Sequence, residues 1–171
     1  MSTIYTIGHS TRSYDEFLEL LKLHDIQILV DVRSLPGSRK FPHFNQENLQ
    51  QSLPQDQIQY QHYKDLGGRR PQQASSHNTL WRNLSFRNYA DYMEMPEFAQ
   101  AIEDLQELWA SSRVCYMCSE AVRWRCHRAL ISDYLKWKWR EVLHIMSPSS
   151  TPEHPYTSVA HSDQGKLSYA P

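Results

Sequence analysis

The sequence predicts an α/β fold in three layers, with a mostly parallel sheet of about five strands flanked by helices. Short apolar runs typical of buried strands alternate along the chain with helical stripes of apolar residues. Nearly every apolar run ends in polar or ionisable residues. A length of 171 residues suits one domain and can bury a sizeable core. Alternating strands and helices imply a sheet that is covered on both faces.

The predicted elements follow one another as far as about residue 146. Five apolar runs are the predicted strands, over residues 3–7, 26–30, 58–62, 114–118 and 142–145. The first helix is expected to begin after Ser13, because Ser13 and Glu16 have the spacing of a capping box. Further helical patterns cover residues 45–52, 86–95, 96–109 and 126–140.

The chain divides into a domain and a tail. Residues 1–146 form a single predicted α/β domain, with a long loop over residues 64–78. Loops of this length in compact domains are often functional. Residues 147–171 are rich in Ser, Pro, Thr and His and have few large apolar side chains. We therefore expect a C-terminal tail without its own core, whose removal after about Ser150 leaves the fold intact.

Charge is balanced overall but segregated along the chain. The net charge is −1, so there is no general basic bias toward nucleic acid. Residues 91–107 contain six acidic and no basic residues, whereas residues 113–140 contain seven basic and two acidic residues, a net of +5. A positive field over the second segment favours an anionic ligand. The alternative is two solvated helix faces of opposite sign.

The sequence also points to a compartment. No apolar run approaches the roughly 20 residues of a membrane-spanning helix. The first residues lack the basic and apolar regions of a signal peptide. Three cysteines, an odd number, argue against a disulfide framework. We therefore expect a cytoplasmic protein.

Polar residues gather where the predicted strands end. Right-handed crossovers bring the carboxyl ends of parallel strands to one edge of the sheet, which is where open α/β sheets place their ligands. The residues at those ends are Gly8-His9-Ser10, Asp31, Arg33 and Ser34, His62-Tyr63, Cys118-Ser119-Glu120, and His144.

Several ordered motifs resemble one family. They are I-Y-T-I-G-H-S-T-R, L-V-D-V-R-S-L-P-G-S-R, L-G-G-R-R, Y-A-D-Y-M and M-C-S-E followed by C-H-R. In this order they resemble domain-of-unknown-function family 488, over about residues 3–146. The resemblance implies a compact α/β domain of bacterial and archaeal type, and it implies little about activity. Residues 121–125, A-V-R-W-R, depart from the acidic or proline-containing loop of typical relatives. The motif residues carried over are His9, Ser10, Asp31, Arg33, Arg39, Gly67, Gly68, Arg69, Tyr89, Tyr92, Cys118, Glu120, Cys126, His127 and Arg128.

Two of the three cysteines are candidate catalytic residues. Cys126 is expected at a helix N-terminus beside cationic neighbours, and both features lower the pKa of a thiol and make it a better nucleophile. The alternative is a half-buried thiol that packs under the helix. Cys118 ends a strand and is the second candidate. Cys115 lies three positions before it, so the two should point to opposite faces of the strand, with Cys115 in the core.

Glu120 and His9 complete the catalytic candidates. Glu120 could act as a general acid or base, or it could neutralise Arg128 or Arg33. His9 is a candidate for proton transfer, with an exposed loop residue as the alternative. Asp31 and Arg33, two positions apart, could face the same side and form a structural ion pair.

Other residues are candidates for binding the substrate. Arg33, Arg39, Arg69 and Arg128 are candidate clamps for a phosphate or carboxylate. A turn at Gly67-Gly68 could bring backbone amides close to a ligand. The remaining predicted binding residues are Ser10, Asp31, Tyr92 and His127.

The leading hypothesis is an enzyme that acts on a small anionic or nucleotide-like substrate at this edge of the sheet. The second is a nucleic-acid or nucleotide binding module without catalysis, for which Trp137-Lys138-Trp139 offers aromatic and basic side chains. Packing of these tryptophans is the alternative reading of that motif. The third is a metal-dependent enzyme with Cys118, Cys126 and a histidine as ligands. No metal or other cofactor is assigned from the sequence.

Overall fold

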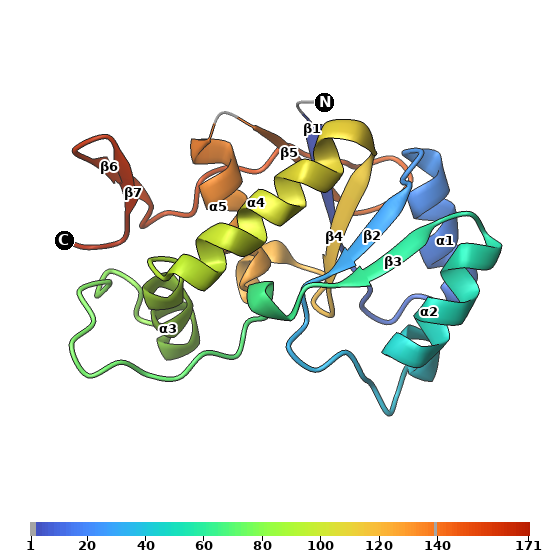
Figure 1. Cartoon of the computed structure of the whole chain (residues 1–171), viewed down its shortest axis with the longest axis horizontal. Coiled ribbons are helices and arrows are strands. Elements are labelled where there is room, and N and C mark those ends of the chain that lie inside the picture. The colour runs from blue at the N-terminus through green and yellow to red at the C-terminus, as the bar shows by residue number, and fades with distance from the viewer. Residues whose placement is uncertain (1–2, 139) are drawn as a thin grey trace.

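A computed structural model of the protein describes residues 3–138 and 140–171 (Figure 1). Its centre is a five-stranded sheet in the order β3-β2-β4-β1-β5, and every neighbouring pair of strands runs parallel. The predicted α/β class is therefore confirmed. The strands are β1 (Thr3–Gly8), β2 (Ile28–Asp31), β3 (Gln59–His62), β4 (Val114–Cys118) and β5 (Glu141–Ile145). The helices are α1 (Tyr14–Leu23), α2 (Gln46–Gln55), α3 (Leu84–Tyr92), α4 (Pro96–Ser111) and α5 (Arg128–Trp137).

Helices cover both faces of the sheet, as Figure 1 shows. One core packs α1 and α2 against the sheet, and the other packs α3, α4 and α5 against the opposite face. Side chains of a strand alternate between the two cores. Cys115 and Met117 of β4 belong to the α1–α2 side, whereas Tyr116 and Cys118 belong to the α5 side. The prediction that Cys115 is a core thiol facing away from Cys118 is confirmed.

The sheet has a topological switch point between β2 and β4. These two strands are hydrogen-bonded neighbours. From β2 the chain passes through α2 to β3, toward one edge, and from β4 it passes through α5 to β5, toward the other. Since α2 and α5 lie on opposite faces, the loops that leave β2 and β4 diverge and open a crevice between them.

The sequence patterns predict most boundaries of helices and strands to within a few residues of those in the structure. Ser13 and Glu16 form the predicted capping box at the start of α1, with both reciprocal hydrogen bonds present. The last helix begins at Arg128, not at Cys126, and ends at Trp137. Cys126 has extended backbone angles (φ −134°, ψ 145°) because a short 3-10 helix, η3 (Arg123–Arg125), ends there. Two further short 3-10 helices are η1 (Pro42–Phe44) and η2 (Lys64–Leu66).

The C-terminal tail packs on the domain. It ends in a hairpin of β6 (His161–Asp163) and β7 (Lys166–Ser168), drawn in red in Figure 1. His154 is 1 % exposed and its amide donates to the carbonyl of Val142 in β5. Tyr169 is 3 % exposed and lies in the core on the α5 side of the sheet. The tail thus fills part of the domain's own core, and these contacts argue against the expectation that the fold stays intact when residues after about Ser150 are removed.

Within the described part of the chain, no helix has the length and apolar character needed to cross a membrane.

Candidate functional site

A cleft of about 440 Å³ opens at the switch point of the sheet. Its walls come from the segments that follow β2 and β4, from the loop after η2, from the start of α3 and from the residues just before α5. Strand ends distant in sequence meet here because the sheet is parallel. The lining residues are Arg33, Ser34, Leu35, Gly37, Gly68, Arg69, Ser85, Phe86, Cys118, Ser119, Glu120, Arg125, Cys126 and His127.

Cys126 is held in this wall by polar contacts to its sulfur. Its side chain lies in the turn that leads into α5 and is 6 % exposed. The backbone N–H of Arg128 donates to Sγ at 3.4 Å, and Nδ1 of His127 lies 3.4 Å from the same sulfur. Burial opposes ionisation, but the Cys118 thiol as a hydrogen-bond donor and the charge and amide of Arg128 together lower the pKa of Cys126 below its ordinary value. The site therefore favours a thiolate at Cys126.

Cys118 is the second thiol of the cleft and has the opposite character. It ends β4, is 2 % exposed, and its Sγ lies 3.7 Å from the carbonyl oxygen of Glu120. Burial, followed by its hydrogen bond to Cys126, raises the pKa of Cys118 well above its ordinary value. Burial also raises the pKa of Cys115 on the other face. Cys118 therefore remains a thiol that can donate to its neighbour.

The ring of His127 is oriented by the backbone. Its Nε2 lies 2.8 Å from the carbonyl oxygen of Val32, the residue that follows β2. A carbonyl can only accept, so Nε2 carries the proton and Nδ1 of the neutral ring is left as an acceptor that faces the sulfur of Cys126. Burial lowers the pKa of His127, which favours this neutral form while Cys126 carries its proton and can donate it to Nδ1. Gly68 makes room for the ring, since a Cβ at Gly68 would lie 2.6 Å from Nδ1 of His127.

Arg128 does not reach the cleft as the predicted substrate clamp. It is 1 % exposed, and its guanidinium donates to Oγ1 of Thr6 at 2.9 Å and to the carbonyl oxygens of Glu120 and Ala121 at 3.0 and 3.5 Å. Burial opposes its charge, but the neighbouring thiols of Cys118 and Cys126 raise the pKa of Arg128. Arg128 thus acts on the thiols from within the domain, because its first position in α5 turns it toward the sheet.

Most hydrogen-bond donors of the Arg33 guanidinium are also paired with groups inside the protein. Its guanidinium forms a bidentate pair with Asp31, donates to the carbonyl of Phe44 at 2.8 Å, and lies 3.3 Å from Nε2 of His9. Asp31 is fully buried, outside the cleft lining. His9 is 3 % exposed and stacks on Phe44 with ring centroids 4.4 Å apart. Of Arg33, Asp31 and His9, only Arg33 contributes to the cleft wall. Asp31 and Arg33 form an ion pair, as the second interpretation of their spacing predicts.

Charged side chains with exposed surface line the rim of the cleft. Glu120 is exposed, and no described residue forms an ion pair or hydrogen bond with its carboxylate. It therefore does not neutralise Arg128 or Arg33. Arg69 and Arg125 are exposed and belong to the lining, and the amide of Arg69 donates to Oγ of Ser34 at 2.9 Å. Arg69 is thus the predicted clamp that lies in the cleft wall with exposed surface, and Arg125, which was not predicted, is the second exposed cation of the lining.

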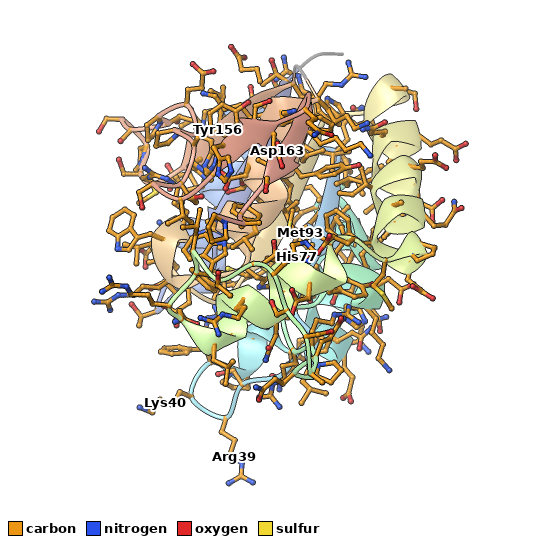
Figure 2. The ribbon with its side chains drawn as sticks, turned by 90° about the vertical axis from the view of Figure 1, so that its left-hand side faces the viewer. Arg39, Lys40, His77, Met93, Tyr156 and Asp163 are labelled. Atoms are coloured by element: carbon orange, nitrogen blue, oxygen red, sulfur yellow. The ribbon has the colours of Figure 1, made fainter. Side chains whose placement is uncertain are left out.

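Four other predicted binding residues lie outside the lining. Ser10 has a left-handed backbone (φ 51°), and its amide donates to the carbonyl of Ser119 at 2.9 Å. Gly67 packs against Ser34, and Tyr92 donates to the carbonyl of Asp65 at 2.6 Å. Arg39 is exposed and projects away from the molecule, as Figure 2 shows. Ser10, Gly67 and Tyr92 therefore shape or pack the loops around the cleft, whereas Arg39 extends into solvent.

Sequence reasoning missed part of the cleft. The sequence identifies Ser34 and Ser119 as residues at strand ends and Arg125 as a cation beside Cys126, but it does not predict that they line the cleft. The beginning of α3 gave no signal, because its approach to the strand ends depends on the long loop that precedes it. The lining residues missed are Ser34, Leu35, Gly37, Ser85, Phe86, Ser119 and Arg125.

Two other expectations concern metals and tryptophans. Over residues 3–138 and 140–171, no three His, Cys, Asp or Glu side chains are arranged to hold a metal ion. Trp137 packs beside Tyr134, with ring centroids 6.0 Å apart. Trp139 lies outside the described residues.

Comparison with known proteins gives one match. The family model described as "Domain of unknown function DUF488" matches residues 13–135. Neither the curated proteins nor the solved structures contain a match. The matched segment runs from the cap of α1 to within α5, so it includes both cysteines of the cleft.

Proposed function

The chain belongs to the family described as "Domain of unknown function DUF488", and we propose a function for it from the geometry of the cleft. It is a cytoplasmic enzyme that uses the thiol of Cys126 to act on a small anionic or nucleotide-like substrate. The observation that carries this proposal is the contact between Cys126 and His127. Nδ1 of the ring, 3.4 Å from Sγ, is the acceptor nitrogen of an imidazole whose other nitrogen is fixed by the carbonyl of Val32. Paired Cys and His side chains of this kind activate a thiol for nucleophilic attack.

The chemistry follows from these positions. His127 accepts the proton of Cys126, and the thiolate is stabilised by the Arg128 amide and by the Cys118 thiol. The sulfur then forms a bond to the electrophilic atom of the substrate, and the bond to the leaving group breaks with its electron pair. Glu120, exposed at the rim, can exchange a proton with the leaving group or with a water molecule that later releases the product.

An anionic substrate suits the charges around the cleft. Arg69 and Arg125 are the exposed cations of the lining, and Ser34 and Ser119 add hydroxyl groups. Arginine binds phosphate and carboxylate groups in a bidentate geometry. Phe86 provides an apolar wall against which a ring of a nucleotide-like substrate can pack.

The proposal is tested by alkylating the native protein across pH and following each cysteine by mass spectrometry. Cys126 should react first, with a midpoint below about 8.5, the ordinary value for a thiol. Cys118 should follow, and Cys115 should be inert. Inorganic phosphate should slow the reaction of Cys126, and this protection should weaken in the variants Arg69→Gln and Arg125→Gln.

The matched control is Arg39→Gln, because Arg39 is an exposed arginine outside the cleft lining whose side chain projects away from the molecule (Figure 2). Phosphate should protect this variant as well as it protects the unmodified protein. A Cys126 midpoint at or above that of an ordinary thiol, or equal protection in all three arginine variants, would contradict the proposal.

A binding function for single-stranded nucleic acid is the second candidate. Trp124 is 58 % exposed and stands between Arg123 and Arg125 at the edge of the cleft. Exposed aromatic rings flanked by cations bind stacked bases. Salt-dependent binding of a short oligonucleotide, lost in Trp124→Ala but unaffected by Cys126→Ser, would favour this function.

A further inference from the structure

A buried chain of hydrogen bonds leads from the thiol site into the domain. Arg128 donates through Nη1 to Oγ1 of Thr6 at 2.9 Å, and the same oxygen lies 2.7 Å from Nδ1 of His144. Nε2 of His144 lies 2.8 Å from Nδ1 of His154, and Nε2 of His154 lies 2.8 Å from Oδ1 of Asp133. All five side chains are at most 1 % exposed. Such an unbroken buried polar chain calls for an explanation beyond packing, because each member loses its hydration.

The direction of each hydrogen bond follows from the two ends. Oδ1 of Asp133 accepts from the amide of Thr157, so Nε2 of His154, which contacts the same oxygen, is the protonated nitrogen and its Nδ1 is an acceptor. His144 then donates through Nε2 and accepts through Nδ1, and Thr6 donates its hydroxyl proton to His144. The remaining lone pairs of Thr6 face the guanidinium, which can only donate. Each of the four hydrogen bonds from Nη1 of Arg128 to Asp133 therefore pairs a donor with an acceptor, whereas Nε of Arg128 has no hydrogen-bond partner among the described residues.

This series of hydrogen bonds does not transfer protons to the thiol site. Its end at the active site is an arginine, which keeps its proton in proteins. A chain that ends in a permanent donor can fix where that donor lies, but it cannot deliver a proton. In addition, burial and the neighbouring cations and histidine lower the pKa of His144 to about 2, so its ring stays neutral.

We propose that Thr6, His144, His154 and Asp133 are positioning residues that hold the Arg128 guanidinium against the thiols of Cys118 and Cys126. This inference deepens the proposed function and rests on it, since the positioned charge matters through the thiolate of Cys126. The parallel register supports it, because Thr6 of β1 and His144 of β5 are direct neighbours in the sheet.

The C-terminal tail completes the positioning chain, the hydrogen-bonded series formed by Thr6, His144, His154 and Asp133. His154 belongs to the tail and joins His144 to Asp133. Thr157 donates to Asp133 through its amide at 3.0 Å and through its hydroxyl, and the hydroxyl of Tyr169 donates to Oδ2 of Asp133 at 2.8 Å. These donors satisfy the carboxylate that anchors the chain. The tail therefore stabilises the thiol site although it does not touch the cleft.

The pH response of Cys126 is the appropriate measurement, and several groups face this thiol. Cys118 at the end of β4, Tyr89 of α3, and His127 and Arg128 at the start of α5 are its ionisable neighbours. Among them only Arg128 is linked to the positioning chain. A change in Thr6 should therefore alter the Cys126 midpoint through the guanidinium alone.

The experiment compares Thr6→Val with Thr6→Ser in the full chain. Thr6→Val keeps the shape but removes the hydroxyl, so the alkylation midpoint of Cys126 should rise by about one pH unit, which is about a tenfold loss of thiolate at neutral pH. Thr6→Ser retains the hydroxyl and should restore the original midpoint. Tyr14→Phe is the matched control, because it removes a partly buried hydrogen bond to Asp56 at 2.8 Å on the opposite side of the sheet. It should leave the midpoint unchanged.

A second measurement does not depend on thiol acidity or on a folded variant. Nitrogen-15 NMR of the unmodified protein should show His144 and His154 as Nε2–H tautomers. The inference is overturned if either ring has the other tautomer, if Thr6→Val folds with an unchanged midpoint, or if Thr6→Ser raises the midpoint as much as Thr6→Val. If Cys126 of the unmodified protein has an ordinary midpoint while the predicted tautomers are observed, the proposed function fails and the hydrogen-bonded chain remains as a structural feature.

Discussion

Asp31 and Arg33, two residues apart at the end of β2, form a buried bidentate ion pair. Nε of Arg33 lies 2.9 Å from Oδ1 of Asp31, and Nη2 lies 2.7 Å from Oδ2. The carboxylate is fully buried and the guanidinium is 6 % exposed. The pair also fixes His9, whose Nε2 lies 3.3 Å from Nη1 of Arg33. This relationship ties the segment after β2 to the loop after β1.

Removal of one partner of this pair should be strongly destabilising. Arg33→Met leaves the Asp31 carboxylate buried without its cation, and we expect a loss of about 3–5 kcal/mol in the free energy of unfolding. The double variant Asp31→Leu with Arg33→Met should lose less, because it removes both buried charges. Urea unfolding of the three proteins measures the difference. Equal losses in the single and double variants would show that the pair is not the source of the stability.

Gly8 should not tolerate a side chain. A Cβ at this position would lie 1.7 Å from the carbonyl oxygen of Glu120, which itself accepts from Arg128. Gly8→Ala should therefore displace the loop after β4 and cost about 1–3 kcal/mol of unfolding free energy. The control is Gly37→Ala, where a Cβ would come no closer than 3.8 Å to its neighbours. An unchanged free energy of unfolding in Gly8→Ala would mean that the loop after β4 can move without cost.

Truncation after Ser150 should destabilise the domain. It removes His154, Thr157 and Tyr169, and so leaves the buried carboxylate of Asp133 without these three donors. Loss of the buried Tyr169 side chain from the core, together with these hydrogen bonds, costs several kcal/mol, so the thermal midpoint should fall by more than several degrees. Calorimetry of the truncated and full chains measures the change. Removal of Pro171 alone is the control and should have little effect, whereas an unchanged midpoint after the long truncation would restore the view of a dispensable tail.

Stability should decrease as the pH falls below about 6.5, the ordinary pKa of histidine. Burial is the main cause that lowers the pKa of His9 to about 4 and that of His144 to about 2. Between these values and 6.5 the unfolded chain binds protons that the folded protein does not, so acid favours unfolding. For His9 the loss between pH 6.5 and 4 is at most about 3 kcal/mol.

The measurement is the free energy of unfolding by urea from pH 8 to pH 4. His9→Gln removes one titrating group and should flatten the decline, even if it lowers stability at pH 8. A decline of the same steepness in this variant would assign the acid sensitivity to other groups.

Three features could be predicted from the sequence: the alternation of strands and helices, the capping box at Ser13 and Glu16, and the opposite faces of Cys115 and Cys118. These features depend on local periodicity, which is written in neighbouring residues. Because parallel strands end at the same edge, the order of the strands predicts that His9, Arg33, Cys118, Glu120, Cys126 and Arg128 share one cleft. Arg33, Cys118, Glu120 and Cys126 line it, whereas His9 and Arg128 are buried outside the lining.

The role of each polar side chain at the cleft could not be predicted from the sequence, because it depends on contacts made in the folded protein. Arg33 and Arg128 have the same chemistry as Arg69 and Arg125 in the sequence, but the first two are buried on internal acceptors and the last two reach solvent. The links from Thr6 to His144 and from His154 to Asp133 join residues 138 and 21 positions apart. Burial and partner choice depend on which segments the fold brings together, and no local pattern encodes those distances.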